Sequence, residues 1–103
     1  MHVNFSAPIN VAPSARETLV RIMREGVTNA VRHANASEIN VELFNGRDVR
    51  LRISDNGLGF DPLSDARGGF GLSSMRERAR VAGGDLRLVS RPGAGTQIEV
   101  VLP

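Results

Sequence analysis

The residues most able to bind a ligand or to act in chemistry lie at 55–60, Asp-Asn-Gly-Leu-Gly-Phe, where a carboxylate is followed by two glycines. The alternating run before it, residues 48–54, predicts a half-buried strand that ends at Asp55. Asn-Gly breaks the strand, and Gly57 and Gly59 are expected to take positive φ and to let the backbone approach a ligand. A carboxylate fixed at the end of a sheet suits the acceptance of hydrogen bonds from a small donor, such as an exocyclic amine. The alternative is an ordinary β-turn with a solvated carboxylate.

Two other groups of residues are candidates for ligand binding or catalysis. Glu25 and Asn29 lie four residues apart on a predicted helix and therefore share a face, whose alternative interpretation is a solvated helix surface. Residues 68–72, Gly-Gly-Phe-Gly-Leu, open a second predicted helix, where free amides and the helix dipole can bind phosphate. A flexible turn is the alternative there. No P-loop is present, and Ser74 stands where a dinucleotide fingerprint needs its last glycine.

The elements that position these groups follow from periodicity. The first helix is predicted over residues 14–34, with Ser14 as N-cap and Glu17 completing a capping box. Ile22 is assigned to the polar stripe of this helix, which Gly26 thins. The residues predicted to face a sheet recur at helical spacing: Leu19, Val20, Met23, Val27, Ala30, Val31 and Ala34. The other predicted elements are a short edge strand at 2–5, strands at 38–44 and 48–54 joined by an Asn45-Gly46 hairpin turn, a helix at 72–82 stopped by Gly83-Gly84, a strand that begins with Leu86, and a closing strand at 96–102.

Composition limits the function classes. At 103 residues and 41% hydrophobic content, the chain is expected to form one domain with its own core. The absence of cysteine excludes disulfides and thiolate metal sites. With 13 basic and 11 acidic residues and only four aromatics, no nucleic-acid footprint is evident. No apolar stretch has the length of a membrane span, and the start lacks a signal-peptide pattern. The lack of cysteine is compatible with the cytoplasm, which is the expected location.

Taken in order, the motifs resemble those of the GHKL ATPases. Residues 24–34 resemble the N box, residues 55–60 the first glycine box, residues 68–72 the second, and Gly95-Thr96 the final glycine-threonine element. The resemblance covers the chain from Ser14 onward. The Asn-Ala-Val-Arg-His-Ala form of the N box is most similar to sensor histidine kinases of the NarL-partnered type, as is the short connection between the two glycine boxes. A separate phenylalanine-rich box is not seen.

The resemblance implies a fold and its ligands. The fold is a two-layer α/β sandwich, the Bergerat fold, with a mixed, mostly antiparallel sheet and helices on one face. Residues 1–103 form a single ATP-binding domain cut from a larger kinase, with ATP and Mg²⁺ as cofactors. The implied nucleotide-binding residues are Asn29, Asp55, Gly57, Gly59, Gly69, Gly71, Leu72 and Thr96.

The resemblance also implies individual roles. Asp55 accepts a hydrogen bond from the adenine amino group, and Thr96 helps through its hydroxyl or a shared water. Asn29 supplies one oxygen to Mg²⁺, and the glycines of the second glycine box let backbone amides approach the phosphates. Glu25 is the implied catalytic residue, acting as a base or as a group that polarises the attacking nucleophile.

In a histidine kinase that nucleophile is a histidine on a separate dimerisation domain of the same kinase, and a response regulator is the downstream partner. His33 is not the acceptor, because it lies on the ATP-side helix itself. The isolated domain is expected to be a monomer. Two alternatives stay open: an anti-sigma-factor serine kinase of the same fold, and a non-catalytic nucleotide-sensing or interaction module.

Overall fold

The computed structural model describes residues 2–5, 13–32, 35–59 and 72–103. In chain order the elements are β1 (His2–Phe5), α1 (Pro13–Arg32), β2 (Ile39–Asn45), β3 (Val49–Asp55), α2 (Leu72–Val81), β4 (Asp85–Ser90) and β5 (Thr96–Leu102). The predicted type and order of these elements are confirmed. Neither of the two helices in the described ranges has the length and hydrophobicity of a membrane span.

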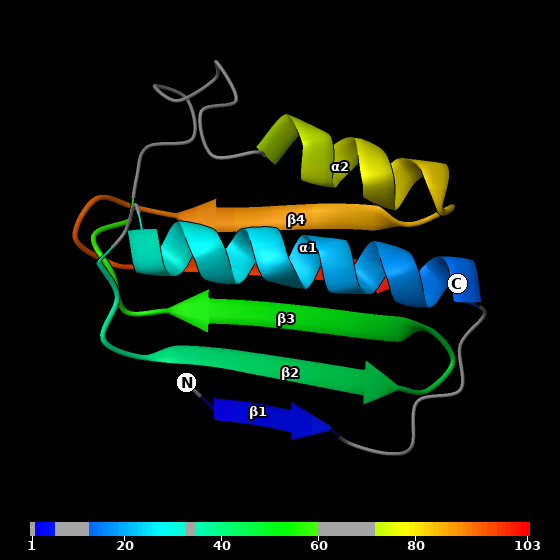
Figure 1. Cartoon of the computed structure of the whole chain (residues 1–103), viewed down its shortest axis with the longest axis horizontal. Helices are drawn as coiled ribbons and strands as arrows, with labels where there is room; N and C mark the ends of the chain where they lie inside the picture. Colours follow the sequence, from blue (N-terminus) through cyan, green and yellow to red (C-terminus); the bar gives the residue numbers. More distant parts are fainter. Residues whose placement is uncertain (1, 6–12, 33–34, 60–71) are drawn as a thin grey trace.

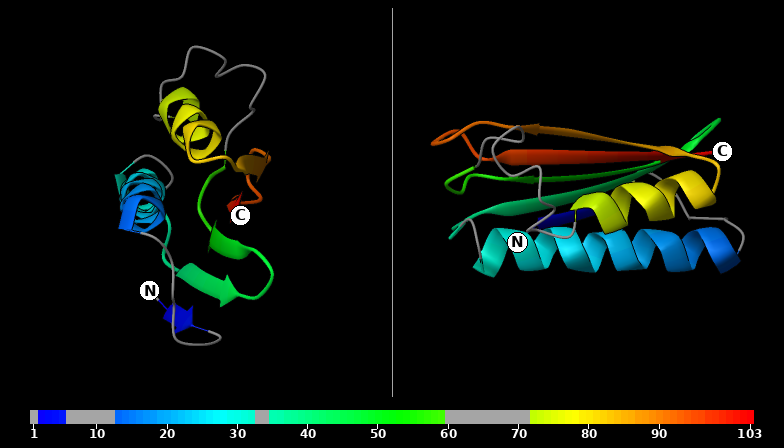
Figure 2. Two further views of the ribbon diagram at one scale, coloured as in Figure 1. Left: turned by 90° about the vertical axis from the view of Figure 1, so that its right-hand side faces the viewer. Right: turned by 90° about the horizontal axis from the view of Figure 1, so that it is seen from above.

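The five strands form one sheet in the order β1-β2-β3-β5-β4. The edge strand β1 pairs with β2 in parallel, whereas the other neighbours are antiparallel. Figure 1 shows α1 crossing in front of the sheet with α2 beside it, and Figure 2 shows both helices on the same face. The predicted two-layer sandwich, with a mixed and mostly antiparallel sheet, is therefore confirmed.

The core lies between α1 and the central strands. One stripe of α1 is buried at three- and four-residue spacing, formed by Leu19, Ile22, Gly26 and Ala30. A Cβ at Gly26 would lie 2.7 Å from Ile53 Cδ1 and 3.6 Å from Ile98 Cδ1. Glycine thus lets the helix lie directly on β3 and β5, and this contact outweighs the helix-propensity cost of about 1 kcal/mol.

Three predictions for α1 were wrong. Ile22 is fully buried at 0% exposure and belongs to the core, not to the polar stripe, whereas Val31 is 57% exposed. The helix begins at Pro13, whose fixed φ and missing N–H suit a first helical position. Ser14 therefore lies inside the first turn and is not the N-cap. Residues 33–34, where the helix was predicted to end, fall outside the described residues.

The turns partly follow the sequence signals. The predicted hairpin between β2 and β3 is confirmed; Asn45 is the last residue of β2 and pairs with Val49, so residues 46–48 form the loop. The glycine stop after α2 is confirmed. Gly84 N–H donates to Ala79 O at 2.8 Å and Gly83 N–H to Arg80 O at 2.9 Å, the pair of bonds of a Schellman C-cap.

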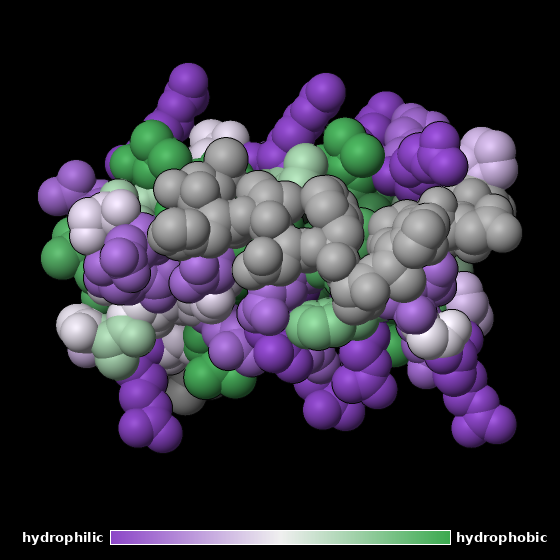
Figure 3. Space-filling model, turned by 90° about the horizontal axis from the view of Figure 1, so that it is seen from below, coloured by the Kyte–Doolittle hydropathy of each residue, from purple (hydrophilic) through white to green (hydrophobic). Residues whose placement is uncertain are grey.

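The face of the sheet opposite the helices carries charges. Arg52 on β3 bonds Glu99 on β5 through Nη2 at 3.0 Å, and its Nη1 lies 3.9 Å from Glu42 Oε1 on β2. The Arg52 guanidinium also stands over the ring of Phe44, 5.5 Å from its centroid. Viewed from the β1 side, hydrophilic side chains project from both layers, and the visible hydrophobic surface is divided into small patches (Figure 3). The charged groups on β2, β3 and β5 therefore make the sheet face opposite the helices compatible with water without a second helix layer.

The end of β3 is tied to the connection between α1 and β2 by Asn56. Its Oδ1 accepts hydrogen bonds from the backbone N–H groups of Ser37 (3.0 Å) and Glu38 (2.9 Å). Its Nδ2 donates to Ser37 Oγ at 2.8 Å, and its backbone N–H donates to Glu38 O at 3.2 Å. Asn56 thus fixes the loop that follows Asp55 relative to the segment that leaves α1.

We expect Asn56→Ala to lower the free energy of unfolding by about 1–2 kcal/mol, because three side-chain hydrogen bonds are lost at a partly solvated site. Ser37→Ala is the matched control, since it removes only one of the three bonds and should cost about 0.5 kcal/mol. Urea denaturation followed by far-UV circular dichroism measures both values. Equal losses in the two variants would contradict a fixing role for Asn56.

Candidate functional site

Three polar side chains form a row across one end of the sheet. Thr96 on β5 pairs with Asp55 on β3 and with Ser90 on β4. Asp55 and Thr96 lie two residues from the buried Ile53 and Ile98, so the alternation of a strand directs them to the helix-covered face. The prediction that Asp55 ends its strand is confirmed.

The Asp55 carboxylate is oriented by the loop that follows it. Its Oδ1 accepts a hydrogen bond from Gly57 N–H at 2.8 Å. Among the described residues this is the only side-chain hydrogen bond of Asp55, so the second carboxylate oxygen keeps its lone pairs for an external donor. Gly57 does not have positive φ, so that expectation was wrong. Its contribution at this site is its N–H.

The two glycine motifs beside Asp55 pack against each other. Gly59 has φ of 65°, as predicted, and a Cβ there would overlap the carbonyl oxygen of Arg91. Gly95 has φ of 78°, and a Cβ there would overlap the carbonyl oxygen of Asp55. Both positions thus require glycine for close approach within the chain itself. The turn between β4 and β5 is thereby held against the end of β3, beside the polar row.

The polar residues of α1 lie above this end of the sheet. The C-terminal end of α1 reaches the same end of the molecule as the end of β3 and the start of β5 (Figure 1). Asn29, three residues after the contact at Gly26, lies in the last turn of α1 and is half-buried. Glu25, one turn earlier on the same face, is also half-buried.

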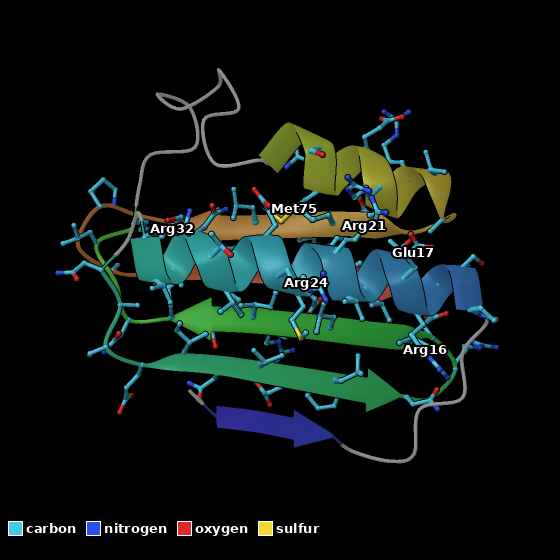
Figure 4. The ribbon with its side chains drawn as sticks, viewed as in Figure 1. Arg16, Glu17, Arg21, Arg24, Arg32 and Met75 are labelled. Carbon is cyan, nitrogen blue, oxygen red and sulfur yellow. The ribbon has the colours of Figure 1, made fainter. Side chains whose placement is uncertain are left out.

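Glu25 contributes to a cavity between the helices. The cavity has a volume of about 350 Å³ and is lined by Arg21, Arg24, Glu25, Ser74, Met75 and Arg78. Figure 4 shows Arg21 on the side of α1 that faces α2, and Met75 between the two helices. Arg21 is paired with Glu17 at 3.0 Å. Arg24 and Arg78 beside Glu25 still leave a local excess of positive charge, which suits an anionic ligand.

The structure therefore brings some predicted residues together and leaves others apart. Asp55 and Thr96 are direct neighbours, and Asn29 lies at the same end of the fold. Glu25 faces the interhelical cavity. Leu72 is the first residue of α2, whereas Gly69 and Gly71 lie outside the described residues.

Two residues of this region were not identified as site residues from the sequence. Asn56 was read only as half of an Asn-Gly turn, and Ser90 only as a strand residue. Ser90 shares the inward parity of Leu86 and is 7% exposed, so a hydroxyl at an inward position near a strand end was the available signal.

Comparison with known proteins agrees with this geometry. Residues 14–103 match the family model of histidine kinase-, DNA gyrase B- and HSP90-like ATPases. The sensor protein VraS of Staphylococcus haemolyticus is 43% identical over 94 residues, which are 90% of this chain and 27% of that protein. VraS of Staphylococcus aureus shows the same identity and coverage. The chain thus spans about a quarter of the length of these relatives.

Two solved structures have a similar fold. The histidine kinase domain from the Erythrobacter litoralis EL346 blue-light activated histidine kinase gives a TM-score of 0.76 at 22% identity, over 99% of this chain and 54% of that one. The ATP binding domain of PrrB from Mycobacterium tuberculosis gives 0.69 at 21% identity, over 100% of this chain and 79% of that one. The NarL-partnered subtype stays a prediction. From the matched family model and the geometry above, the chain belongs to the histidine kinase-, DNA gyrase B- and HSP90-like ATPases, and it is an ATP-binding domain of that family.

Proposed function

We propose that this chain is the catalytic ATP-binding domain of a two-component sensor histidine kinase. It supplies the γ-phosphate of ATP to a histidine on a separate dimerisation domain of the same kinase. The observation that carries the proposal is the Asp55 carboxylate, which Gly57 N–H holds by one oxygen and whose residue pairs with Thr96 on the neighbouring strand. The sensor function in the names of the 43% identical relatives favours this proposal over the serine kinase and the non-catalytic module.

The base is recognised at the polar row. The second carboxylate oxygen of Asp55 accepts a hydrogen bond from the exocyclic amine of adenine, with Thr96 adjacent on the next strand. Guanine would place a carbonyl oxygen against the carboxylate, and an unpaired buried acceptor costs about 1–3 kcal/mol. Gly57, Gly59 and Gly95 shape the backbone around the carboxylate.

The phosphates and the metal belong to the other half of the site. The arginines of the interhelical cavity and the N-terminus of α2, which Leu72 begins, provide positive potential for phosphate. Gly69 and Gly71 are proposed to bring backbone amides to it. The Asn29 amide oxygen is a hard ligand of the kind that Mg²⁺ prefers, and water and phosphate oxygens would complete the octahedron.

Glu25 is the proposed catalytic residue. It lies one turn before Asn29 on the same face of α1 and lines the cavity with the arginines. From there its carboxylate would accept or polarise the proton of the incoming histidine. When bound, Mg²⁺ neutralises phosphate charge.

The wider assignment follows from the same reading. Residues 1–103 are proposed to be one domain of a longer kinase, in agreement with their coverage of 27% of the relatives. The partners are the histidine-containing dimerisation domain and a downstream response regulator, with no role for nucleic acid. The isolated domain is proposed to be a monomer, and its place is the cytoplasm, where ATP is supplied.

We expect Asp55→Asn to weaken ATP binding by at least about 100-fold, which corresponds to about 3 kcal/mol. Gly57 N–H would hold the amide oxygen of the new side chain, and its NH₂ group would then face the adenine amine, donor against donor. Calorimetry, or displacement of a ribose-labelled fluorescent ATP, measures the loss, since the chain has no tryptophan or tyrosine. Asp48→Asn, the same change next to the far end of β3, is the control and should bind normally. Wild-type affinity in a folded Asp55→Asn protein would refute the adenine assignment.

We expect Asn29→Ala to weaken Mg·ATP binding by about tenfold or more, because one metal ligand is lost. Binding of ATP in EDTA should change much less. Titrations in the two conditions separate these effects, and Thr28→Ala, at an exposed position on the same helix, is the control. An equal loss with and without the metal would instead assign Asn29 a structural role.

We expect Glu25→Gln to bind ATP nearly normally but to transfer phosphate about 10²–10⁴-fold more slowly, because a group acting in the transition state affects turnover more than ground-state binding. The assay requires the histidine domain of the parent kinase, added in trans. Glu17→Gln, an exposed position two turns earlier on α1, is the control. Undiminished transfer by Glu25→Gln would make Glu25 a solvated helix residue, and lost ATP affinity would place it in the binding shell.

A further inference from the structure

Ser90 closes the polar row on the side away from Asp55. It is the last residue of β4 and is only 7% exposed. Its Oγ lies 3.1 Å from the carbonyl oxygen of Gly95 and 2.8 Å from Thr96 Oγ1. A buried hydroxyl placed between a carbonyl oxygen and a second hydroxyl controls where the two hydroxyl protons point.

The direction of both hydrogen bonds follows from counting protons. A carbonyl oxygen can only accept, so Ser90 must donate its single hydroxyl proton to Gly95 O. With that proton committed, the bond between Ser90 Oγ and Thr96 Oγ1 requires Thr96 as the donor. The Thr96 hydroxyl proton therefore points at Ser90, away from Asp55.

This direction of the Thr96 proton determines what the hydroxyl can offer to a ligand. Its Oγ1 has no second proton to give and offers only lone pairs to a group placed between it and Asp55. The carboxylate of Asp55, on the neighbouring strand, is also an acceptor. The Asp55–Thr96 pair thus presents acceptors alone, and Ser90 makes it so.

We propose that Ser90 is a specificity-determining positioning residue, which acts through Thr96 to select a 6-amino purine over a 6-oxo purine. The inference rests on the proposed function, since it takes the Asp55–Thr96 pair as the base site. An amino group brings two N–H donors to two acceptors. A carbonyl oxygen at the same position meets acceptors on both sides, and the Thr96 hydroxyl cannot turn to help it.

The experiment compares ATP with ITP, whose base carries a 6-oxo group and lacks the 2-amino group of guanine. Affinities are measured on the 103-residue chain by displacement of a ribose-labelled fluorescent ATP. Wild type should prefer ATP by at least about 100-fold. Ser90→Ala frees the Thr96 proton, so ITP should bind more tightly, ATP should lose only a few-fold, and the preference should fall by about tenfold or more.

Two further variants serve as a graded substitution and as a matched control. Ser90→Cys is nearly isosteric and only a weak donor, so its preference should fall between wild type and Ser90→Ala, even if the alanine variant folds poorly. Ser54→Ala makes the same chemical change next to Asp55, but on the opposite face of the sheet, and should leave the preference unchanged. Far-UV circular dichroism checks the fold of each variant.

The outcomes separate the two proposals. Equal losses of ATP and ITP affinity in both Ser90 variants leave the preference unchanged and would make Ser90 merely structural. Unchanged affinities for both nucleotides would likewise overturn its role. In either case, ATP binding by the wild-type chain would still support the proposed function. A wild-type chain that binds ATP and ITP alike would also overturn the inference. A wild-type chain that binds neither nucleotide would overturn the proposed function and, with it, this inference.

Discussion

The close packing of α1 on the sheet is the contact on which the site depends. At Gly26 the helix approaches so closely that a Cβ would come within 2.7 Å of Ile53 Cδ1. Because protein cores are close-packed, this contact fixes the height and rotation of the helix relative to β3 and β5. Two residues after Ile53 on β3 and two residues before Ile98 on β5, the apolar contact gives way to Asp55 and Thr96. A hydrophobic interaction thus positions the polar groups, none of which could hold the layers together by itself.

Strand alternation divides the sheet into two surfaces with different roles. The helix-covered face contains the apolar core and, at one end, the row from Asp55 to Ser90. The opposite face carries the Arg52 pairs with Glu42 and Glu99. Partly exposed pairs of this kind contribute about 0–1 kcal/mol each, whereas a buried aliphatic side chain contributes about 1.5–3 kcal/mol. The charges therefore keep the open face soluble and in register, and the core supplies most of the stability.

The binding groups are oriented before any ligand arrives. Gly57 holds one oxygen of Asp55, and the Gly59 and Gly95 contacts press the β4–β5 turn against the same strand end. Asn56 anchors the loop to the segment that leaves α1. Groups that are already fixed lose little conformational freedom on binding, so more of each contact is available as affinity. The same fixed geometry gives the hydroxyls of the row a definite direction.

The sequence alone determined the order and type of the elements, the position of Asp55 at a strand end, and the family motifs, because these depend on local periodicity and short spacings. It misplaced Ile22. Several sets of residues on one helix share the three- and four-residue spacing, and only the tertiary structure shows which set packs against Ile53 and Ile98. It missed Asn56, whose partners Ser37 and Glu38 lie in a distant segment of the chain, and Ser90, whose hydrogen bonds depend on the fold of the turn between β4 and β5. Only the tertiary structure decided that Asp55, Thr96 and Ser90 share one row, because strand order and register bring together residues up to 41 positions apart.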